Sequence, residues 1–299
     1  MSETWVTLPN GSSIRLVGHY GTDALLAEVA RNSVGGLASV KKASSDRALI
    51  RRLVRDLHTS PLEFGQMHFQ VVTSIMVERQ HVRHRTQSLS VRSDRYTKRP
   101  KGETSADGFP VRIGSYPIRK QSALNRQMSE GLVDEEVSNE FLRRLLEHST
   151  KGLELYHDMV ESGSAREQAR QALSLDSSTV YHFTMDTWNL MHFLRLRLAL
   201  DAQVEIRELA EEMYKHFKVL FPILAEAFED YIRQAVRLSR MEHAVLKDMA
   251  HLLRRDPAAL DALRKSISRN LDTEAGASVT ERRHLLEVLG LTEALSDLL

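Results

Sequence analysis

Apolar residues recur at helical spacing in two segments near the start of the chain. Residues 22–34, TDALLAEVARNSV, place Leu25, Leu26 and Val29 close to one helical face. Residues 44–60, SSDRALIRRLVRDLHTS, repeat that spacing behind Ser and Asp residues that suit a helix N-terminus. Both segments are predicted to be helices.

The pattern then changes to a period of two. Residues 65–75, GQMHFQVVTSI, alternate Met67, Phe69 and Val71 with polar positions, which is typical of a strand that packs on one face. We therefore predict a strand here, in addition to a short strand or loop at the beginning of the chain.

Helical spacing returns directly after this strand. Residues 74–85, SIMVERQHVRHR, can form a helix on which Gln80, Arg83 and His84 share a face. Residues 97–118 contain several Gly and Pro residues, and loops of that length are usually functional or mobile. We expect an irregular loop that is able to act as a lid.

The second half of the chain reads as helical. The spacing of apolar residues predicts helices within residues 134–162, 164–173 and 202–238, and the strongly apolar residues 180–200 are predicted to be helical as well. Residues 240–299 are richer in charge and are interrupted by Gly and Pro. We expect them to form a helical appendage.

Composition narrows the classes of protein to which the chain can belong. Its 299 residues suffice for a substantial core, and a net charge of +1 makes it no polycation. It contains no cysteine, which excludes disulfides, zinc-thiolate sites and cysteine nucleophiles, and we assign no metal site. Without a signal-peptide core or a run of about 18 apolar residues, we expect a soluble, cytoplasmic protein.

Positive charge is nevertheless concentrated in residues 79–101. This stretch holds eight Arg or Lys residues and a single acid, Asp94. Arginine presents a planar fork of donors that stays charged, which suits phosphates and the carbonyl edges of heterocycles. Spacing alone leaves open a solvated basic turn, a nucleotide site and a nucleic-acid surface; the last is disfavoured because only Tyr96 offers a stacking ring nearby.

A specific motif within this stretch decides between these interpretations. The pattern RHRxxSxxxxSxR is fulfilled at six positions by Arg83, His84, Arg85, Ser88, Ser93 and Arg95. It resembles the signature of the flavin-dependent thymidylate synthases, in which a Tyr also commonly follows, as Tyr96 does here.

The resemblance extends well beyond the motif. HTSPLEF resembles that family's H-x-S-P-x-E-H, ERQHVRHR places Gln80 three residues before the motif, and RKQSALNRQMSEG resembles its Q-S-x-x-N-x-Q loop. AREQARQAL and LMHFLRLRLALDAQVEIRELA resemble its paired-Arg segment and its long helix ending in L-R. Residues 15 to about 232 look like one such domain, so we expect a domain at 1–239 and the appendage at 240–299.

The resemblance implies a fold, a reaction and an assembly. The fold would be mixed α/β (α+β), with a central, mostly antiparallel sheet flanked by helices and a helix-rich second half. The reaction would be methylation of C5 of dUMP, with FAD as cofactor, methylenetetrahydrofolate as carbon donor and NADPH as reductant. The absence of cysteine fits, because this family adds no enzyme thiolate to the uracil ring. The assembly would be a homotetramer with active sites shared between subunits.

The resemblance also implies roles for individual residues. Arg197 would be catalytic, because its charge would stabilise electron density on a uracil carbonyl oxygen as C5 becomes nucleophilic. The remaining roles are binding roles: Gln80, Ser93, the backbone of Asp94, Arg95, Arg170 and Arg197 for the nucleotide, and Arg83, His84, Arg85, Ser88 and His192 for FAD.

Four positions depart from the family pattern. Phe64 stands where His is usual, Val91 where Glu is frequent, Asp186 where Asn is frequent and Asp201 where His is frequent. These changes keep two alternatives open: a homologue that methylates UMP for nucleoside antibiotics, and a nucleotide-binding homologue without turnover. A DNA-binding domain is a third alternative, and it predicts steeply salt-dependent affinity with no flavin.

Overall fold

The fold comes from a computed structural model that describes residues 4–32, 43–271 and 279–298. By the contacts between their Cα atoms the residues divide into two units, one of residues 1–37 and 57–226 and one of residues 38–56 and 227–299. The first unit contains the sheet and every candidate site residue.

A five-stranded antiparallel sheet forms the centre of the first unit. Its order is β1-β2-β3-β7-β4, with pairing throughout antiparallel. The strands are β1 (Val6–Thr7), β2 (Ser13–Tyr20), β3 (Gln66–Ser74), β4 (Ser88–Val91) and β7 (Ser178–Asp186). A separate hairpin consists of β5 (Arg119–Gln121) and β6 (Ser129–Leu132).

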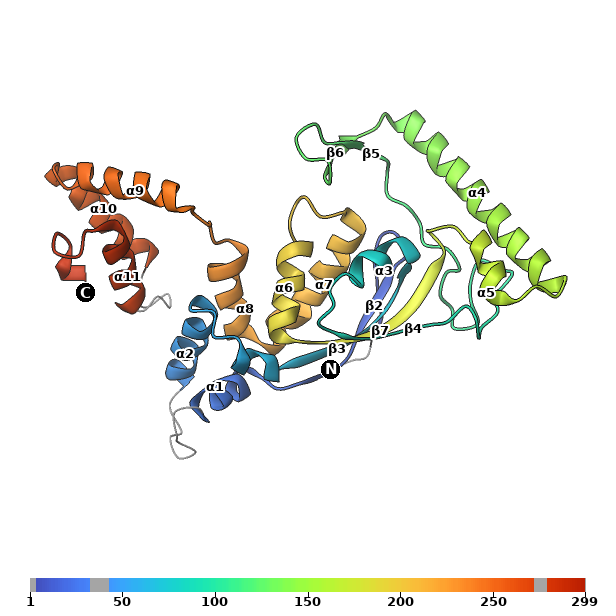
Figure 1. The fold of residues 1–299 in the computed structure, drawn as a ribbon, viewed down its shortest axis with the longest axis horizontal. Helices are drawn as coiled ribbons and strands as arrows, with labels where there is room; N and C mark the ends of the chain where they lie inside the picture. Colours follow the sequence, from blue (N-terminus) through green and yellow to red (C-terminus); the bar gives the residue numbers. More distant parts are fainter. Residues whose placement is uncertain (1–3, 33–42, 272–278, 299) are drawn as a thin grey trace. The chain divides into compact units, whose positions relative to one another are not determined.

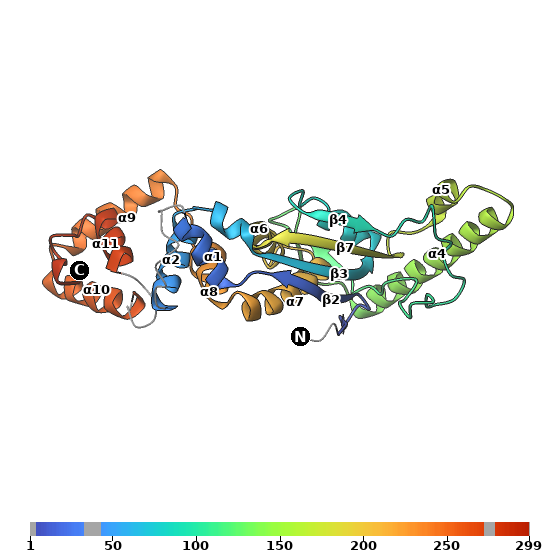
Figure 2. The same ribbon diagram turned by 90° about the horizontal axis from the view of Figure 1, so that it is seen from below.

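One face of the sheet is apolar and carries helices. Phe69 lies opposite Phe183 in the register of β3 and β7, and their stacked rings have centroids 5.4 Å apart. Figures 1 and 2 show α6 and α7 on this face. Phe193 of α6 and Phe217 of α7 are fully buried, so burial of aromatic surface holds the two layers together.

The first unit contains several helices, not all of which pack on the sheet. They are α1 (Asp23–Asn32), the 3₁₀ helix η1 (Ser60–Phe64), α3 (Ile75–His81), α4 (Glu135–Glu161), α5 (Arg166–Ala169), the 3₁₀ helix η2 (Arg170–Ala172), α6 (Thr187–Arg197) and α7 (Val204–Leu220). α4 and α5 lie beyond the Ser178 end of β7 (Figure 1). The mixed α/β fold and the antiparallel sheet expected from the resemblance are confirmed.

Several sequence predictions are confirmed element by element. The strand predicted at 65–75 is β3, with Met67, Phe69 and Val71 buried. The two predicted N-terminal helices are α1 and α2 (Ala43–Arg55). Residues 33 and 34 of the first prediction lie outside the described residues. Residues 97–118 contain no helix and no strand longer than an isolated bridge.

Two predictions about secondary structure were wrong. Residues 178–186 form β7 rather than helix, and Tyr181, Phe183 and Met185 are buried at a period of two. Helix α6 begins at Thr187, with Asp186 as its N-cap. The helix predicted at 74–85 ends at His81, so Arg83 and His84 follow its end instead of sharing a helical face with Gln80.

The second unit is helical and has a core of its own. It contains α2, α9 (Arg240–Leu253), α10 (Pro257–Asn270), α11 (Val279–Leu289) and the 3₁₀ helix η4 (Ser296–Leu298); α8 (Pro222–Phe228) and the π-helix η3 (Glu229–Arg233) precede α9. Leu286, Leu291 and Leu295 are fully buried in its core. The domain limits 1–239 and 240–299 stay predictions, because contacts alone do not test which segments fold independently.

Among the described helices, none combines the length and the apolar character needed to cross a membrane.

Candidate functional site

The ends of α3 and α6 bring together one group of candidate residues. The Nε atom of Arg197, the last residue of α6, donates a hydrogen bond of 3.0 Å to Nε2 of His84. The His84 side chain is buried, and its ring meets Phe193 edge to face with centroids 4.7 Å apart. An Nε2 atom that accepts must be unprotonated, so this imidazole is neutral with its proton on Nδ1.

Burial controls the charge of this pair. It lowers the pKa of His84 to about 4, and the positive charge of Arg197 and the ring of His192 act in the same direction. Burial also lowers the pKa of Arg197, against a weaker opposing effect of Asp201. A guanidinium stays charged in proteins. The pair therefore presents a half-buried cation next to a neutral imidazole, and no carboxylate of the described residues is hydrogen-bonded to that cation.

A second histidine, His81, is buried next to this pair. His81 is fully buried; its Nε2 lies 3.0 Å from Oε1 of Gln87 and its Nδ1 lies 3.1 Å from the hydroxyl of Tyr181. Burial lowers the pKa of His81 to about 3, so the ring is neutral and both nitrogens are satisfied. Sequence reasoning missed this network, because it joins His81, at the end of α3, to Tyr181 of β7, which is 100 residues away in the chain.

The other residues of the motif lie around the pair and are accessible. Arg83 and Arg85 are exposed, and within the described chain neither side chain forms a hydrogen bond or an ion pair. Ser88 is exposed at the beginning of β4, opposite Thr184. His192 is exposed on α6, with its ring centroid 6.2 Å from that of His84.

Gln80 connects α3 to the start of α7. Its side-chain amide donates to Oε1 of Gln203, the residue that precedes α7. Gln203 also borders a pocket of about 400 Å³ that is lined by the beginning of α3, the beginning of α7, the β5–β6 hairpin and α4, with Tyr116, Arg119 and Asp201 in its wall. That volume is within the range of small-molecule sites. The Q-S-x-x-N-x-Q segment of the sequence forms this hairpin.

The remaining nucleotide-binding candidates gather at a different place, around the turn after β4. Arg95 donates to Oε2 of Glu167 at 2.8 Å, and both side chains are more than half exposed (58% and 53%). The backbone of the turn is closed by bonds of 3.2 Å from the amides of Tyr96 and Thr97 to the carbonyl of Ser93. The Ser93 hydroxyl accepts from the Arg95 amide.

Arg170 is attached to the same group through the backbone. Its Nε donates to the carbonyl of Glu167 at 3.3 Å, and its side chain is exposed. A Cβ atom on Gly152 of α4 would lie 2.5 Å from the carbonyl oxygen of Ala172. Glycine therefore allows α4 to approach η2, the short helix that begins with Arg170.

Most of the candidates thus form two clusters in one chain, with Gln80 and Ser88 outside both. The RHR cluster consists of Arg83, His84, Arg85, His192 and Arg197; the turn cluster consists of Ser93, Asp94, Arg95, Glu167 and Arg170. Strand β4 separates them along the chain, and among the described residues no hydrogen bond or ring contact joins the two. In the described part of the chain, no group of three His, Asp or Glu residues is arranged to hold a metal ion.

The four departures from the family pattern have distinct structural positions. Asp186 caps α6: its Oδ1 accepts from the Asn189 amide at 2.9 Å. Phe64 is 53% exposed at the end of η1, and Val91 is 38% exposed at the end of β4. Asp201 is exposed near Arg197, whose charge it favours. Among the four, the N-cap gives Asp186 a structural reason of its own.

Comparisons with known proteins agree on one family. A family model described as "Thymidylate synthase complementing protein" matches residues 15–223. Flavin-dependent thymidylate synthase from Thermus thermophilus is 38% identical over 237 residues, covering 79% of this chain and 82% of that protein. That from Dictyostelium discoideum is 34% identical over 220 residues, covering 74% and 69%.

Solved structures give the same result. The UMP/dUMP methylase PolB from Streptomyces cacaoi, bound with 5-Br dUMP, has a TM-score of 0.65 and 28% identity, covering 76% of this chain and 99% of that one. The same protein bound with 5-Br UMP covers 76% and 98%. The residues that the family model matches include both clusters of this chain.

Proposed function

Since this chain belongs to the flavin-dependent thymidylate synthase family, we propose that it methylates C5 of dUMP to give dTMP with a bound FAD. Methylenetetrahydrofolate is the proposed carbon donor and NADPH the proposed reductant. The observation that carries the proposal is the bond from Arg197 to neutral His84, within the region that the family model matches.

The residues of the RHR cluster fit a flavin. Arg83 and Arg85 are two exposed guanidinium forks without partners among the described residues, and such forks match the oxygens of a pyrophosphate. His84 adds a buried, neutral ring beside Phe193. Arg83, His84, Arg85, Ser88 and His192 are the proposed FAD-binding residues. When bound, FAD supplies the redox chemistry that C5 methylation requires.

Arg197 is the proposed catalytic residue. Making C5 of uracil nucleophilic moves electron density onto a ring carbonyl oxygen, and a cation in a low-dielectric site stabilises that charge far better than one in water. Arg197 is half-buried, and its Nε is held by His84. This bond fixes the direction of the guanidinium and leaves its other donors for the substrate.

The turn cluster is proposed to hold the nucleotide. Arg95 and Arg170 are exposed cations of the kind that bind phosphate, and Ser93 and the backbone of Asp94 offer neutral contacts to sugar and base. Gln80, which lies on α3 outside this cluster, is proposed to add a further neutral contact to the nucleotide. The Ser93 hydroxyl accepts a backbone hydrogen bond, and no general base bonds to it among the described residues. We therefore assign it to binding rather than to nucleophilic attack.

The division into two clusters supports a proposed homotetramer whose sites take residues from several subunits. A long helix with an apolar stripe offers the required surface: Val137, Phe141 and Leu145 of α4 lie four residues apart and are 43–44% exposed. The native mass tests this assembly, because a monomer with full activity would contradict it. The cytoplasm, where nucleotides and reduced cofactors are made, is the proposed location.

Parallel assays on dUMP and UMP test the function. Flavin-loaded protein is given methylenetetrahydrofolate and NADPH with either nucleotide, each tritiated at C5, and the release of tritium is followed. We expect release from dUMP that exceeds release from UMP. A protein that binds FAD and dUMP but releases no tritium from either would contradict the proposed function and favour a binding protein.

A further inference from the structure

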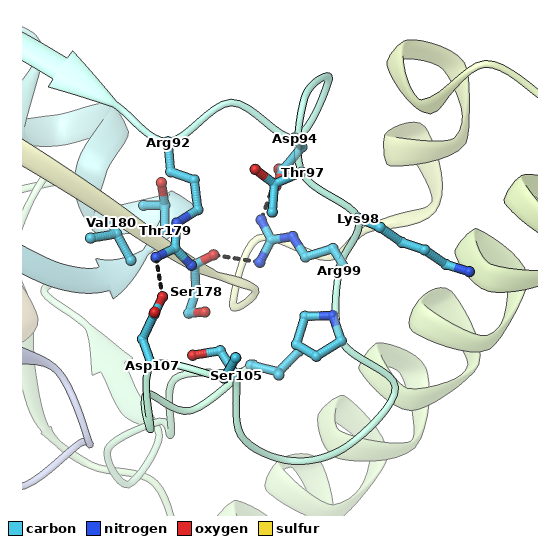
Figure 3. Close-up of a pocket in the computed structure, with 13 residues that line it drawn as sticks. Arg92, Asp94, Thr97, Lys98, Arg99, Ser105, Asp107, Ser178, Thr179 and Val180 are labelled. Carbon is cyan, nitrogen blue, oxygen red and sulfur yellow. Dashed lines mark hydrogen bonds and ion pairs between the residues drawn. The ribbon is translucent and has the colours of Figure 1, made fainter.

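The turn that carries Ser93, Asp94 and Arg95 has a cavity beneath it instead of packed side chains. The cavity has a volume of about 390 Å³, and its wall includes Asp94, Thr97, Arg99 and the first residues of β7 (Figure 3). A turn that borders a cavity gains less positional order from packing than one with a filled interior. Polar contacts therefore hold it in place. Two polar tethers lie at its ends, and Nη1 of Arg166 donates to the carbonyls of Arg95 at 3.4 Å and Tyr96 at 2.7 Å.

The two tethers attach to neighbouring points on β7. At one end, the Arg92 amide donates to the carbonyl of Val180 at 2.8 Å. At the other end, Nη1 of Arg99 donates to the carbonyl of Ser178 at 2.5 Å, and the Arg99 amide donates to the hydroxyl of Tyr156, which is fully buried. The first tether is a regular continuation of the sheet, whereas the second depends on a side chain.

The same Arg99 side chain also grips the turn itself. Its Nη2 lies 2.8 Å from Oδ2 of Asp94, and the two side chains are only 9% and 18% exposed. Figure 3 shows the guanidinium between Asp94 and Ser178. The buried Nε has no partner among the described residues, so the guanidinium depends on these two contacts. Removing either charge would leave the other buried and unpaired, which is strongly unfavourable.

The geometry points to Arg99 as a positioning residue for substrate binding, an inference that rests on the proposed function. Arg99 ties Asp94 to β7 and so fixes the turn in the conformation that presents the Asp94 backbone and the Arg95 side chain to the nucleotide. It acts through the turn and not on the reacting atoms. Its loss should weaken nucleotide binding without affecting the flavin or the chemical step.

Three variants test this role. Arg99→Met removes both contacts, Arg99→Lys keeps the charge with a single ammonium, and Asp94→Asn removes the opposite charge. We expect Arg99→Met to raise the Kd for dUMP about ten-fold in calorimetry of the flavin-loaded protein, with kcat at saturating dUMP changed less than three-fold. Arg99→Lys should raise the Kd for dUMP less than Arg99→Met does. The double variant Arg99→Met/Asp94→Asn should have a Kd for dUMP no higher than that of Arg99→Met.

Arg112→Met is the matched control. Arg112 is also a partly buried cation that pairs with an acid, Asp176, but it lies outside the turn. We expect it to lower thermal stability and to leave the Kd for dUMP unchanged. Should it weaken dUMP binding as much as Arg99→Met does, the effect would be general destabilisation and the inference would fail.

Hydrogen exchange of the Tyr96 and Thr97 amides gives a readout that does not need activity. Both amides are bonded within the turn, so Arg99→Met should make them exchange at least ten-fold faster, and Arg112→Met should not. Wild-type exchange in Arg99→Met, or a wild-type Kd for dUMP, overturns the inference. Wild-type protein that exchanges as expected but never methylates dUMP would instead contradict the proposed function.

Discussion

The two clusters use arginine in opposite ways. In the RHR cluster, Arg197 is half-buried and bonds to a neutral imidazole, and burial lowers its pKa. In the turn cluster, Arg95 is 58% exposed and pairs with a carboxylate, Glu167. A desolvated cation interacts strongly with charge that appears during a reaction, whereas an exposed cation in an ion pair interacts weakly and can exchange one anion for another.

This difference indicates how the work is divided. The RHR cluster suits a step in which negative charge develops on a ring, and the turn cluster suits a phosphate that is charged from the beginning. A phosphate can take the place of Glu167 at Arg95 with little change in solvation. The same exchange at Arg197 would have to displace His84 from a buried position.

The largest expected effect comes from Arg197→Ala. Removing the buried cation should lower kcat by about 10² to 10³, the usual loss when one donor to a developing oxyanion is deleted. FAD should stay bound, because its proposed phosphate contacts are elsewhere. Turnover of tritiated dUMP is measured together with flavin absorbance, and Arg195→Ala on the same helix is the control. Unchanged kcat would remove Arg197 from the chemistry.

Arg83→Ala comes next. A charge-assisted contact to a phosphate contributes about 1.5–3 kcal/mol, so the affinity for FAD should fall between roughly ten-fold and one hundred-fold. Flavin retained after gel filtration is the measurement, with Arg143→Ala on α4 as an exposed-arginine control. If Arg83→Ala kept one FAD per chain with wild-type affinity, the RHR cluster would lose its proposed role as flavin site.

Arg95→Ala should have a smaller effect of a different kind. Its cation is exposed and screened, so we expect the KM for dUMP to rise about ten-fold or less, with kcat nearly unchanged. The increase should shrink as salt is added, because salt already weakens this contact in the wild-type protein. An equal loss in kcat would place Arg95 with Arg197 and break the distinction between the clusters.

Lowering the pH should reduce the stability of the folded protein through His81, which is buried beside the RHR cluster. Its pKa is about 3 in the folded protein and ordinary when unfolded, so only the unfolded chain takes up a proton as the pH falls below about 6.5. Stability should therefore decrease from pH 6.5 downward, by at most about 1.4 kcal/mol per pH unit from this group. Above pH 6.5 the contribution of His81 to the free energy of unfolding no longer changes with pH.

Urea unfolding of the wild-type protein and of His81→Gln between pH 5 and pH 7 measures this contribution. The variant should show a shallower slope of unfolding free energy against pH, by about 1 kcal/mol per pH unit. His84, whose pKa is also lowered by burial, adds to the slope in both proteins. Identical slopes would mean that His81 is accessible to protons in the folded state.

The sequence predicted the elements whose pattern is locally clear. β3 alternates from Gln66 to Val71, and α4 begins behind Asp134, whose carboxylate accepts from two amides of its first turn. β7 was missed because its apolar residues and those of α6 follow one another without a Gly or Pro between the two elements. The boundary between β7 and α6 lies at Asp186, which is the N-cap of α6. Asp186 can be recognised as an N-cap only when it is known that a strand precedes it.

The residues of the candidate site could be predicted from the resemblance to a family, and much less from the spacing and chemistry of the residues alone. The motif identified Arg83 and His84 as candidates, and the resemblance of the long helix identified Arg197. The arrangement of the three depends on tertiary contacts that no local pattern encodes. The neutral state of His84 follows from burial by Phe193 and from the donor of Arg197. No sequence motif pointed to Arg99. Its partner on β7 is a backbone carbonyl, which leaves no side-chain pattern in the sequence.

Single-turnover rates at saturating dUMP test the division between the clusters most directly. Flavin-reduced protein is mixed with excess dUMP and methylenetetrahydrofolate, and the first turnover is followed in the wild type, Arg95→Ala and Arg197→Ala. We predict that saturating dUMP restores the wild-type rate to Arg95→Ala and leaves Arg197→Ala at least one hundred-fold slower. Equal slowing of both variants, or of neither, would contradict the account.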